Sequence, residues 1–158
     1  MNRFNIRVYG ILINEKKQVL VSDEYIRGNY FTKFPGGGLE FGEGTRDCVK
    51  REFKEELNLE TEIGNHIYTT DYFQLSAFHS EQQIISIYYY VKALENISVP
   101  FRVKLFDFDE QQLENYEATG ETETFRLINW DDFSEDCVTL PIDKIAARIV
   151  KSNAIYPS

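Results

Sequence analysis

The stretch that decides the fold runs from Gly37 to Leu59 and reads GGLEFGEGTRDCVKREFKEELNL. A glycine-rich turn, FPGGG over residues 34–38, leads directly into it. Near its end, Glu52, Glu55 and Glu56 occupy positions i, i+3 and i+4 of what the pattern predicts to be one helix. Carboxylates at this spacing build a small, oxygen-rich cation site, and such sites commonly serve phosphate chemistry.

The predicted helix covers residues 45–57. Thr45 is the candidate N-cap, and Asp47 suits the positive end of the helix dipole. Asn58 can end the helix in the left-handed conformation. The apolar residues that recur every four positions are Val49, Phe53 and Leu57. They predict a stripe that faces the core.

The three carboxylates share one side of this helix and lie beside the apolar stripe. At a separation of about 5 Å and an effective dielectric constant of about 20, two of these carboxylates repel each other by roughly 3 kcal/mol. A divalent cation would reverse that repulsion, and oxygen ligands select Mg²⁺, Mn²⁺ or Ca²⁺ over zinc. Arg51 lies four residues before Glu55 and can orient a carboxylate. Glu43 can accept from Arg51 or add another oxygen, and the glycine turn lets backbone carbonyls approach the ion.

Short apolar runs on both sides of the helix predict strands. We expect a hairpin formed by residues 4–13 and 18–22, a loop over 23–30, and strands over 66–75, 83–94 and 125–130. Residues 95–123 are acidic and irregular, with a further strand expected over 101–108. A final helix is expected to begin at residues 140–143. The residues expected on its buried face are Ile142, Ile145, Ala146 and Ile149. This order predicts a mixed α/β domain.

Length and composition limit the function classes. The chain has 158 residues, and we expect one domain over residues 1–158. The net charge of −9 argues against a nucleic-acid partner, and it means that cations must mediate any binding of phosphates. Cys48 and Cys137 have no metal spacing, and we interpret them as reduced and structural. No run is long enough to span a membrane or to act as a signal peptide, so we expect a cytoplasmic protein without a membrane partner.

Residues 37–59 resemble the signature box of the Nudix hydrolases: Gly, five residues, Glu, seven residues, Arg-Glu-aliphatic-x-Glu-Glu-x-Gly-aliphatic. The sequence matches the box at its conserved charged positions and at both of its ends. The matching residues are Gly37, Glu43, Arg51, Glu52, Glu55, Glu56 and Leu59. Phe53 stands in an aliphatic position, and Asn58 replaces the usual glycine. Asn tolerates the same backbone region as glycine at some cost, and neither departure touches a charged position.

The resemblance implies an α/β/α sandwich around a mixed β-sheet. It also implies that the protein hydrolyses a nucleoside diphosphate linked to another group, and that this activity depends on Mg²⁺ or alternatively on Mn²⁺. By this resemblance Glu52, Glu55 and Glu56 bind the metal, Gly37 offers its backbone carbonyl, and Arg51 orients a carboxylate. Glu43 would support the site. The general base varies in the family, and Glu52, Glu121 and Glu123 are candidates. The catalytic candidates are Arg51, Glu52, Glu55 and Glu123.

Two questions stay open at the level of the sequence. A non-catalytic Nudix-like module that binds a nucleotide or nucleotide-sugar is the rival function, although it need not keep the charged residues of the box. The chain shows no proline or tyrosine at the downstream offsets of ADP-ribose or dinucleoside polyphosphate members. This favours a (deoxy)nucleoside triphosphate or a less common small-molecule nucleotide. Homodimers are frequent in the family, and the sequence does not decide the oligomeric state.

Overall fold

The strands form two mixed four-stranded sheets in a computed structural model that describes residues 1–153. The first sheet has the order β4-β1-β6-β5, with β1 and β6 parallel. Its strands are β4 (Gly36–Gly38), β1 (Arg3–Leu12), β6 (Gln82–Ala93) and β5 (Thr61–Thr69). The second sheet has the order β3-β2-β8-β7, with β7 and β8 parallel. Its strands are β3 (Asn29–Lys33), β2 (Gln18–Ile26), β8 (Glu121–Asn129) and β7 (Phe101–Arg102).

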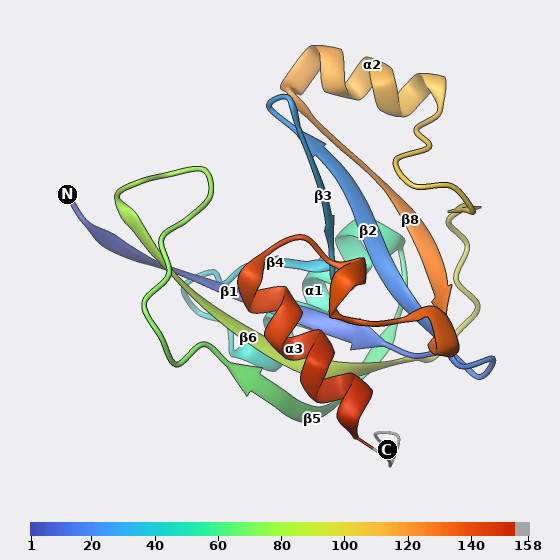
Figure 1. The fold of residues 1–158 in the computed structure, drawn as a ribbon, viewed down its shortest axis with the longest axis horizontal. Coiled ribbons are helices and arrows are strands. Elements are labelled where there is room, and N and C mark those ends of the chain that lie inside the picture. The colour runs from blue at the N-terminus through green and yellow to red at the C-terminus, as the bar shows by residue number, and fades with distance from the viewer. Residues whose placement is uncertain (154–158) are drawn as a thin grey trace.

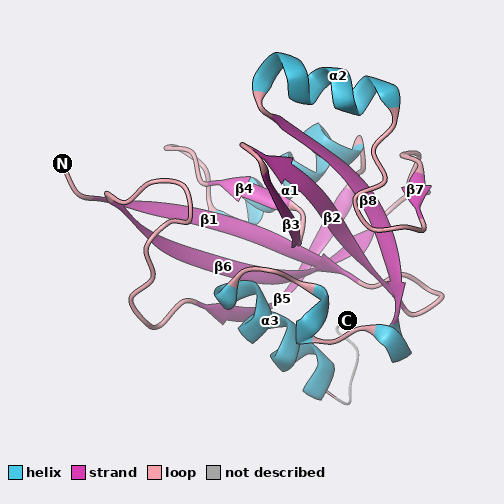
Figure 2. Cartoon of the chain, turned by 45° about the horizontal axis from the view of Figure 1, so that its top comes forward, coloured by secondary structure: helices cyan, strands magenta, loops and turns pink. Residues whose placement is uncertain are grey.

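Three α-helices accompany the sheets in the described residues. Helices α1 (Thr45–Leu57) and α3 (Pro141–Ser152) lie on opposite sides of the strands, as Figures 1 and 2 show. Helix α2 (Glu110–Thr119) lies apart from both, at the start of β8. Two short 3-10 turns, Trp130–Asp132 and Glu135–Cys137, connect β8 to α3. The layers confirm the predicted α/β/α arrangement, with two mixed sheets in the place of one.

Two apolar clusters fill the space on either side of the strands. Because side chains alternate along a strand, Val8 of β1 belongs to the same cluster as Phe53 of α1, whereas Tyr9 belongs to the cluster of Ala146 of α3. Tyr88 and Tyr90 of β6 likewise belong to the α3 cluster, and Tyr89, between them, belongs to the α1 cluster. The strands are therefore buried on both faces, which fixes their register against the two helices.

Helix α1 begins and ends where the sequence predicts. Its apolar stripe is fully buried, and Asn58 adopts the left-handed conformation with φ 49° and ψ 41°. The expected N-cap is wrong by one residue: Gly44 is the cap, and Thr45 is the first helical residue. The Asp47 carboxylate accepts from the Gly44 amide at 3.1 Å and so satisfies one free donor at this end.

The predicted hairpin of the first two runs is wrong. β1 and β2 belong to different sheets, and an isolated bridge joins Ile13, directly after β1, to Val19. β1 pairs instead with β6, and β2 pairs with β8 along its whole length. These pairings join segments that lie far apart in the sequence, so the order of neighbouring segments does not predict them.

The loop expected over residues 23–30 is also wrong. β2 continues to Ile26, and a two-residue turn at Arg27 and Gly28 leads into β3. Both turn residues have positive φ, 47° and 84°, as the tight turn of a twisted hairpin requires. The polar residue Asp23 hides this strand in the sequence.

Asp23 is fully buried and completely paired. Its carboxylate accepts from Arg126 of β8 at 2.5 and 3.0 Å, from the Thr32 hydroxyl at 2.8 Å and from the Phe106 amide at 3.2 Å. A buried carboxylate with this many donors is tolerated in a strand. The network joins β2, β3 and β8 and also holds the segment before α2.

The acidic segment expected to be irregular contains α2. Asp109 caps this helix by accepting from the Gln112 amide at 2.8 Å, and Gly120 ends it in the left-handed conformation. Tyr116 holds the helix to β2, since its ring stacks on Tyr25 with centroids 3.9 Å apart. No residue of α2 is buried. The helix therefore lacks the apolar stripe by which sequence periodicity would reveal it.

Other boundaries differ by several residues. The strand expected over 66–75 lies at 61–69, the one over 101–108 is two residues long, and β8 begins at 121 rather than 125. The final helix is confirmed, but its buried face is rotated: Ile142 and Ala146 are buried, whereas Ile145 and Ile149 are half-buried. Asp143 takes part in the buried face. No helix in the described part of the chain is long and apolar enough to cross a membrane.

Candidate active site

The glycine turn and α1 bring the box residues together. Gly37 lies in β4, opposite Val8 of β1, and its backbone packs directly against the Glu52 carboxyl group. A Cβ atom at Gly37 would lie 2.4 Å from Glu52 Oε1, which is closer than real Cβ contacts allow. At Gly38 the nearest atom to such a Cβ is 3.8 Å away. Any residue other than glycine at position 37 would therefore displace the Glu52 carboxyl group.

Arg51 organises the carboxylates around it. Its guanidinium donates to both oxygens of Glu43, at 2.9 and 2.7 Å, in a bidentate pair. It also donates to Glu52 at 3.0 Å, to Glu55 at 3.2 Å and to the Gly38 carbonyl at 3.1 Å. The hydrogen bonds from Arg51 lower the pKa of Glu43 to about 2. Arg51 thus holds Glu43 ionised and fixes the direction of Glu52 and Glu55.

Glu56 faces a cavity of about 530 Å³ between α1 and the second sheet. Glu52 of α1 and Glu24 and Glu123 of the second sheet also face it, and Glu24 and Glu123 lie directly opposite each other in the β2–β8 pairing. Burial raises the pKa of Glu56 to about 10, and the charge of Glu123 adds to the rise. Burial, followed by Glu24, raises the pKa of Glu123 to about 7. Ionised carboxylates here are unfavourable unless a cation is present.

Most, but not all, of the predicted site residues line this cavity. Glu52, Glu56, Glu121, Glu123 and the backbone of Gly37 line the cavity. The Glu55 side chain is 58% exposed, and its carboxylate is held by Arg51 outside the lining. Among residues 1–153, no three His, Cys, Asp or Glu side chains stand close enough to hold a metal ion as they are. The donor set, which consists of oxygen atoms alone, nevertheless fits a hard divalent cation in its chemistry.

Sequence reasoning missed three residues of the site. Glu24 falls in the segment expected to be a loop, whereas Arg7 and Lys33 lie on strands and carry no motif. Lys33 is nearly buried and donates to Glu24 at 3.4 Å. Burial lowers the pKa of Lys33, but Tyr9 and Glu24 outweigh this effect and raise it overall, so Lys33 is a cation. Arg7 and Lys33 thus place two cationic side chains in one cavity of a chain whose net charge is −9.

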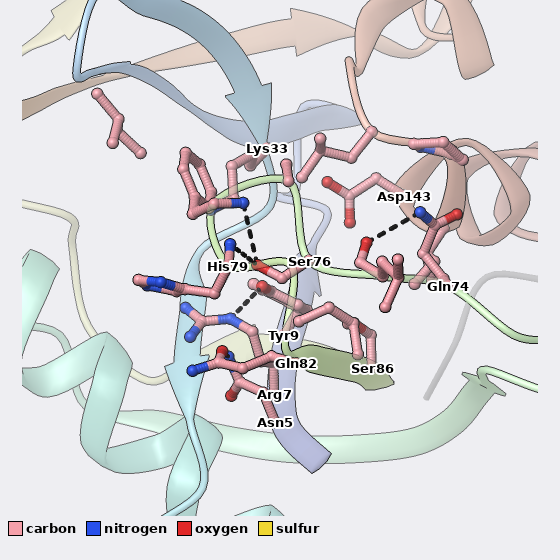
Figure 3. A pocket seen from close by; sticks show the side chains of 18 of the residues that line it. Asn5, Arg7, Tyr9, Lys33, Gln74, Ser76, His79, Gln82, Ser86 and Asp143 are labelled. Atoms are coloured by element: carbon pink, nitrogen blue, oxygen red, sulfur yellow. Dashed lines mark hydrogen bonds between the residues drawn. The ribbon is translucent and has the colours of Figure 1, made fainter. Parts of the chain in front are cut away.

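A second cavity, of about 470 Å³, adjoins the first and shares Arg7, Glu24 and Lys33 with it. Figure 3 shows its polar lining, in which Arg7 donates to the Tyr9 hydroxyl at 2.7 Å. The segment over residues 74–79 and the start of α3 close it. The two cavities together offer a carboxylate-lined end and an end with a mixed polar and apolar lining, and Arg7 and Lys33 lie where the two cavities meet.

A family model for the NUDIX domain matches residues 3–149. The chain belongs to the NUDIX family. Nudix enzymes generally hydrolyse the pyrophosphate bond of nucleoside diphosphate derivatives with the help of divalent cations, and the chain is a Nudix-type pyrophosphatase. The resemblance of residues 37–59 to the Nudix box is thereby confirmed at the level of the whole domain.

Solved structures share the fold at low identity. A MutT NUDIX hydrolase from Burkholderia pseudomallei is 15% identical with a TM-score of 0.67, covering 94% of this chain and 99% of its own. The E. coli ORF135 protein is 13% identical with a TM-score of 0.66, covering 96% and 93%. An ADP-ribose pyrophosphatase from Streptococcus suis is 13% identical with a TM-score of 0.55, covering 96% and 95%. The comparison with curated protein sequences found no match.

Proposed function

We propose that this Nudix enzyme hydrolyses a nucleotide pyrophosphate bond with Mg²⁺, or alternatively Mn²⁺, held by Glu52, Glu55, Glu56 and the Gly37 carbonyl. The observation that carries the proposal is the gathering of Glu24, Glu52, Glu56 and Glu123 around one cavity, where burial raises the pKa of two of these carboxyl groups, Glu56 and Glu123. Such a gathering is costly in a folded protein unless a cation compensates it. When bound, the cation would neutralise the diphosphate and lower the pKa of an attacking water.

The chain's own residues supply orientation and proton transfer. Arg51 keeps Glu52 and Glu55 in place through its hydrogen bonds at 3.0 and 3.2 Å. Arg7 and Lys33, at the junction of the two cavities, would bind phosphate oxygens. Both cations face the carboxylate-lined end, so they would orient the diphosphate along the path between the cavities.

Among the candidate bases we favour Glu123. Its carboxylate accepts from the Ser22 hydroxyl at 3.2 Å and faces the cavity from β8, opposite the helix that carries Glu52. Glu123 would accept a proton from the water as the water oxygen bonds to phosphorus and the bond to the leaving phosphate breaks. Glu52 is less suited, because Arg51 already donates to its carboxyl group, which also packs closely against Gly37.

A panel of nucleoside triphosphates, nucleotide-sugars and dinucleotides with Mg²⁺, analysed by product mass, tests the function and identifies the cleaved bond. We expect hydrolysis by the wild type and large losses in Glu52→Gln and Glu55→Gln, with Glu62→Gln of the exposed face of β5 as the matched control. Hydrolysis unchanged in both site variants would refute the metal site. Thermal stabilisation by a nucleotide without any hydrolysis would favour the binding module instead.

Several properties remain predictions from the sequence. They are the triphosphate preference, the cytoplasmic location, the lack of a nucleic-acid or membrane partner, the possibility of a homodimer and the extent of the domain over residues 1–158. Residues 154–158 lie outside the described part of the chain.

A further inference from the structure

Lys33, one of the two cations that face the carboxylate-lined cavity, is already paired with a carboxylate. Its Nζ donates to Glu24 Oε1 at 3.4 Å, and the side chains of Lys33 and Glu24 are 8% and 15% exposed. Both residues line both cavities, and Figure 3 shows Lys33 in the lining of the second one. The ion pair therefore lies where the two cavities meet.

Glu24 lies on the middle strand of three, between this cation and a second carboxylate. In β2 it is directly opposite Glu123 of β8. On the other side, β3 carries Lys33 opposite Ser22, two positions along β2 from Glu24. Like charges that face each other across neighbouring strands repel when both are ionised. The Glu24 carboxylate therefore gains by turning away from Glu123 and toward Lys33, and this is the arrangement in the structure.

A diphosphate that reaches Lys33 has to replace Glu24, because both are anions that accept from the same ammonium group. Lys33 is nearly buried, so few positions around its Nζ are left for a second anion. A displaced Glu24 carboxylate would also remain in the cavity and repel the phosphate. Arg7 differs, since it donates to the neutral Tyr9 hydroxyl at 2.7 Å. Glu24 thus opposes phosphate binding through Lys33 in particular.

A divalent cation held among the carboxylates would reverse this effect. Glu24 faces the same cavity as Glu52, Glu56 and Glu123, so a cation bound there attracts the Glu24 carboxylate away from Lys33. The Lys33 ammonium can then donate to a phosphate oxygen, and the charge of Glu24 no longer repels the phosphate. One ligand improves the binding of the other in this way whenever both act on the same side chain.

We propose that Glu24 makes phosphate binding conditional on the cation: it pairs with Lys33 and rejects a diphosphate that arrives without a divalent ion. The inference rests on the proposed function for the positions of the cation and the diphosphate. It adds a regulation of that site, in which Glu24 acts through Lys33 on binding rather than on the reacting atoms.

Calorimetric binding of methylenediphosphonate at pH 8 with a chelator tests the proposal, because the P–C–P link of this diphosphate analogue is not hydrolysed. We expect Glu24→Gln to bind it at least about tenfold more tightly than the wild type. Glu121→Gln is the matched control: Glu121 also lines both cavities but is exposed and lies opposite Ile26. Its affinity should stay within about threefold of the wild type.

Three results in the chelator would overturn the proposal. Equal affinity of the wild type and Glu24→Gln would show that Glu24 does not oppose the phosphate. Equal gains in Glu24→Gln and Glu121→Gln would show a general effect of lost negative charge. No measurable binding by Glu24→Gln would show that Lys33, once released, does not bind a diphosphate.

A double-variant comparison assigns the effect to Lys33. In Lys33→Met the cation that Glu24 masks is gone, so the addition of Glu24→Gln should raise the affinity no more than Glu121→Gln does. A tenfold gain that persists in the Lys33→Met background would refute the assignment. Lys33→Met leaves Glu24 without its partner, so circular dichroism has to show that it folds. The comparison of Glu24→Gln with Glu121→Gln stands without this variant.

The same titration with saturating Mg²⁺ tests the dependence on the cation. The wild type should then bind the analogue more tightly, and the advantage of Glu24→Gln should disappear. An advantage of the same size with Mg²⁺ and with chelator would overturn the conditional role of Glu24.

The two proposals fail in different ways. The expected gain of Glu24→Gln in the chelator, without hydrolysis of any nucleotide in the panel, would retain the role of Glu24 and refute the proposed reaction. Hydrolysis by the wild type with Mg²⁺, together with equal affinities in the chelator, would do the reverse.

Discussion

Replacement of Glu56 by Gln should stabilise the metal-free protein at neutral and alkaline pH. Burial raises the pKa of Glu56 to about 10, well above the 4.5 of an ordinary glutamate. The folded state therefore favours the protonated form. The contribution of Glu56 to the free energy of unfolding is fully present below pH 4.5. It is lost as the pH rises toward 10, because Glu56 releases its proton at a lower pH in the unfolded chain than in the folded protein. Gln keeps the shape and cannot ionise, so this loss disappears.

The size of the effect follows from the same shift. Each pH unit above 4.5 costs up to about 1.4 kcal/mol, which gives an upper bound of about 5 kcal/mol at pH 8. Relaxation of the neighbouring carboxylates and partial solvation of Glu56 reduce this to about 2 kcal/mol. Glu123, whose pKa is raised to about 7, adds a smaller dependence that the variant retains.

Urea denaturation in the presence of a chelator, at pH 5, 6, 7 and 8, measures the effect directly. We expect the unfolding free energies of the wild type and Glu56→Gln to agree at pH 5 within error and to diverge steadily toward pH 8, with the variant more stable. Glu62→Gln, on the exposed face of β5, should follow the wild type throughout. A variant that is less stable than the wild type at pH 8 would refute the account of the cavity.

Three further changes test the geometry by activity. Gly37→Ala should lower kcat by at least about tenfold, because its Cβ would displace the Glu52 carboxyl group, whereas Gly38→Ala should stay near the wild type; equal losses would contradict the contact. Arg51→Lys keeps the charge but loses the bidentate fork, and kcat should fall about 100-fold with the fold intact by circular dichroism. Glu123→Gln should lower kcat about 100-fold with little change in KM, and an unaltered pH–rate profile would exclude it as the base.

The sequence predicted the first helix and its charged side chains well, because both depend on local spacing. The apolar period of four positions places α1 correctly from Thr45 to Leu57. The same period places Glu52 and Glu56 toward the strands. After glycine, asparagine is the residue type that most readily adopts the left-handed conformation at a helix end, so Asn58 predicts where the helix ends.

The parts of the site that the sequence could not predict depend on contacts between distant segments. Glu24 reaches the cavity only because β2 pairs with β8, which places Glu24 opposite Glu123, 99 positions along the chain by their residue numbers. The second half of β2 was itself obscured by the polar Asp23, whose burial is explained by its ion pair with Arg126 across the sheet. Asp143 looked like an ordinary first-turn acid of a helix, where a carboxylate suits the dipole. It is instead buried, and the Tyr88 hydroxyl on a different strand donates to it at 2.5 Å.

The most direct test of the central claim is a Mn²⁺ titration followed by electron paramagnetic resonance. The claim is that the carboxylates of α1 and the second sheet hold a divalent cation. Wild-type protein should bind Mn²⁺, more tightly with a non-hydrolysable nucleotide present, and the double variant Glu52→Gln, Glu56→Gln should lose this binding while Glu62→Gln keeps it. Equal Mn²⁺ affinity in the wild type and the double variant, with or without nucleotide, would contradict the account.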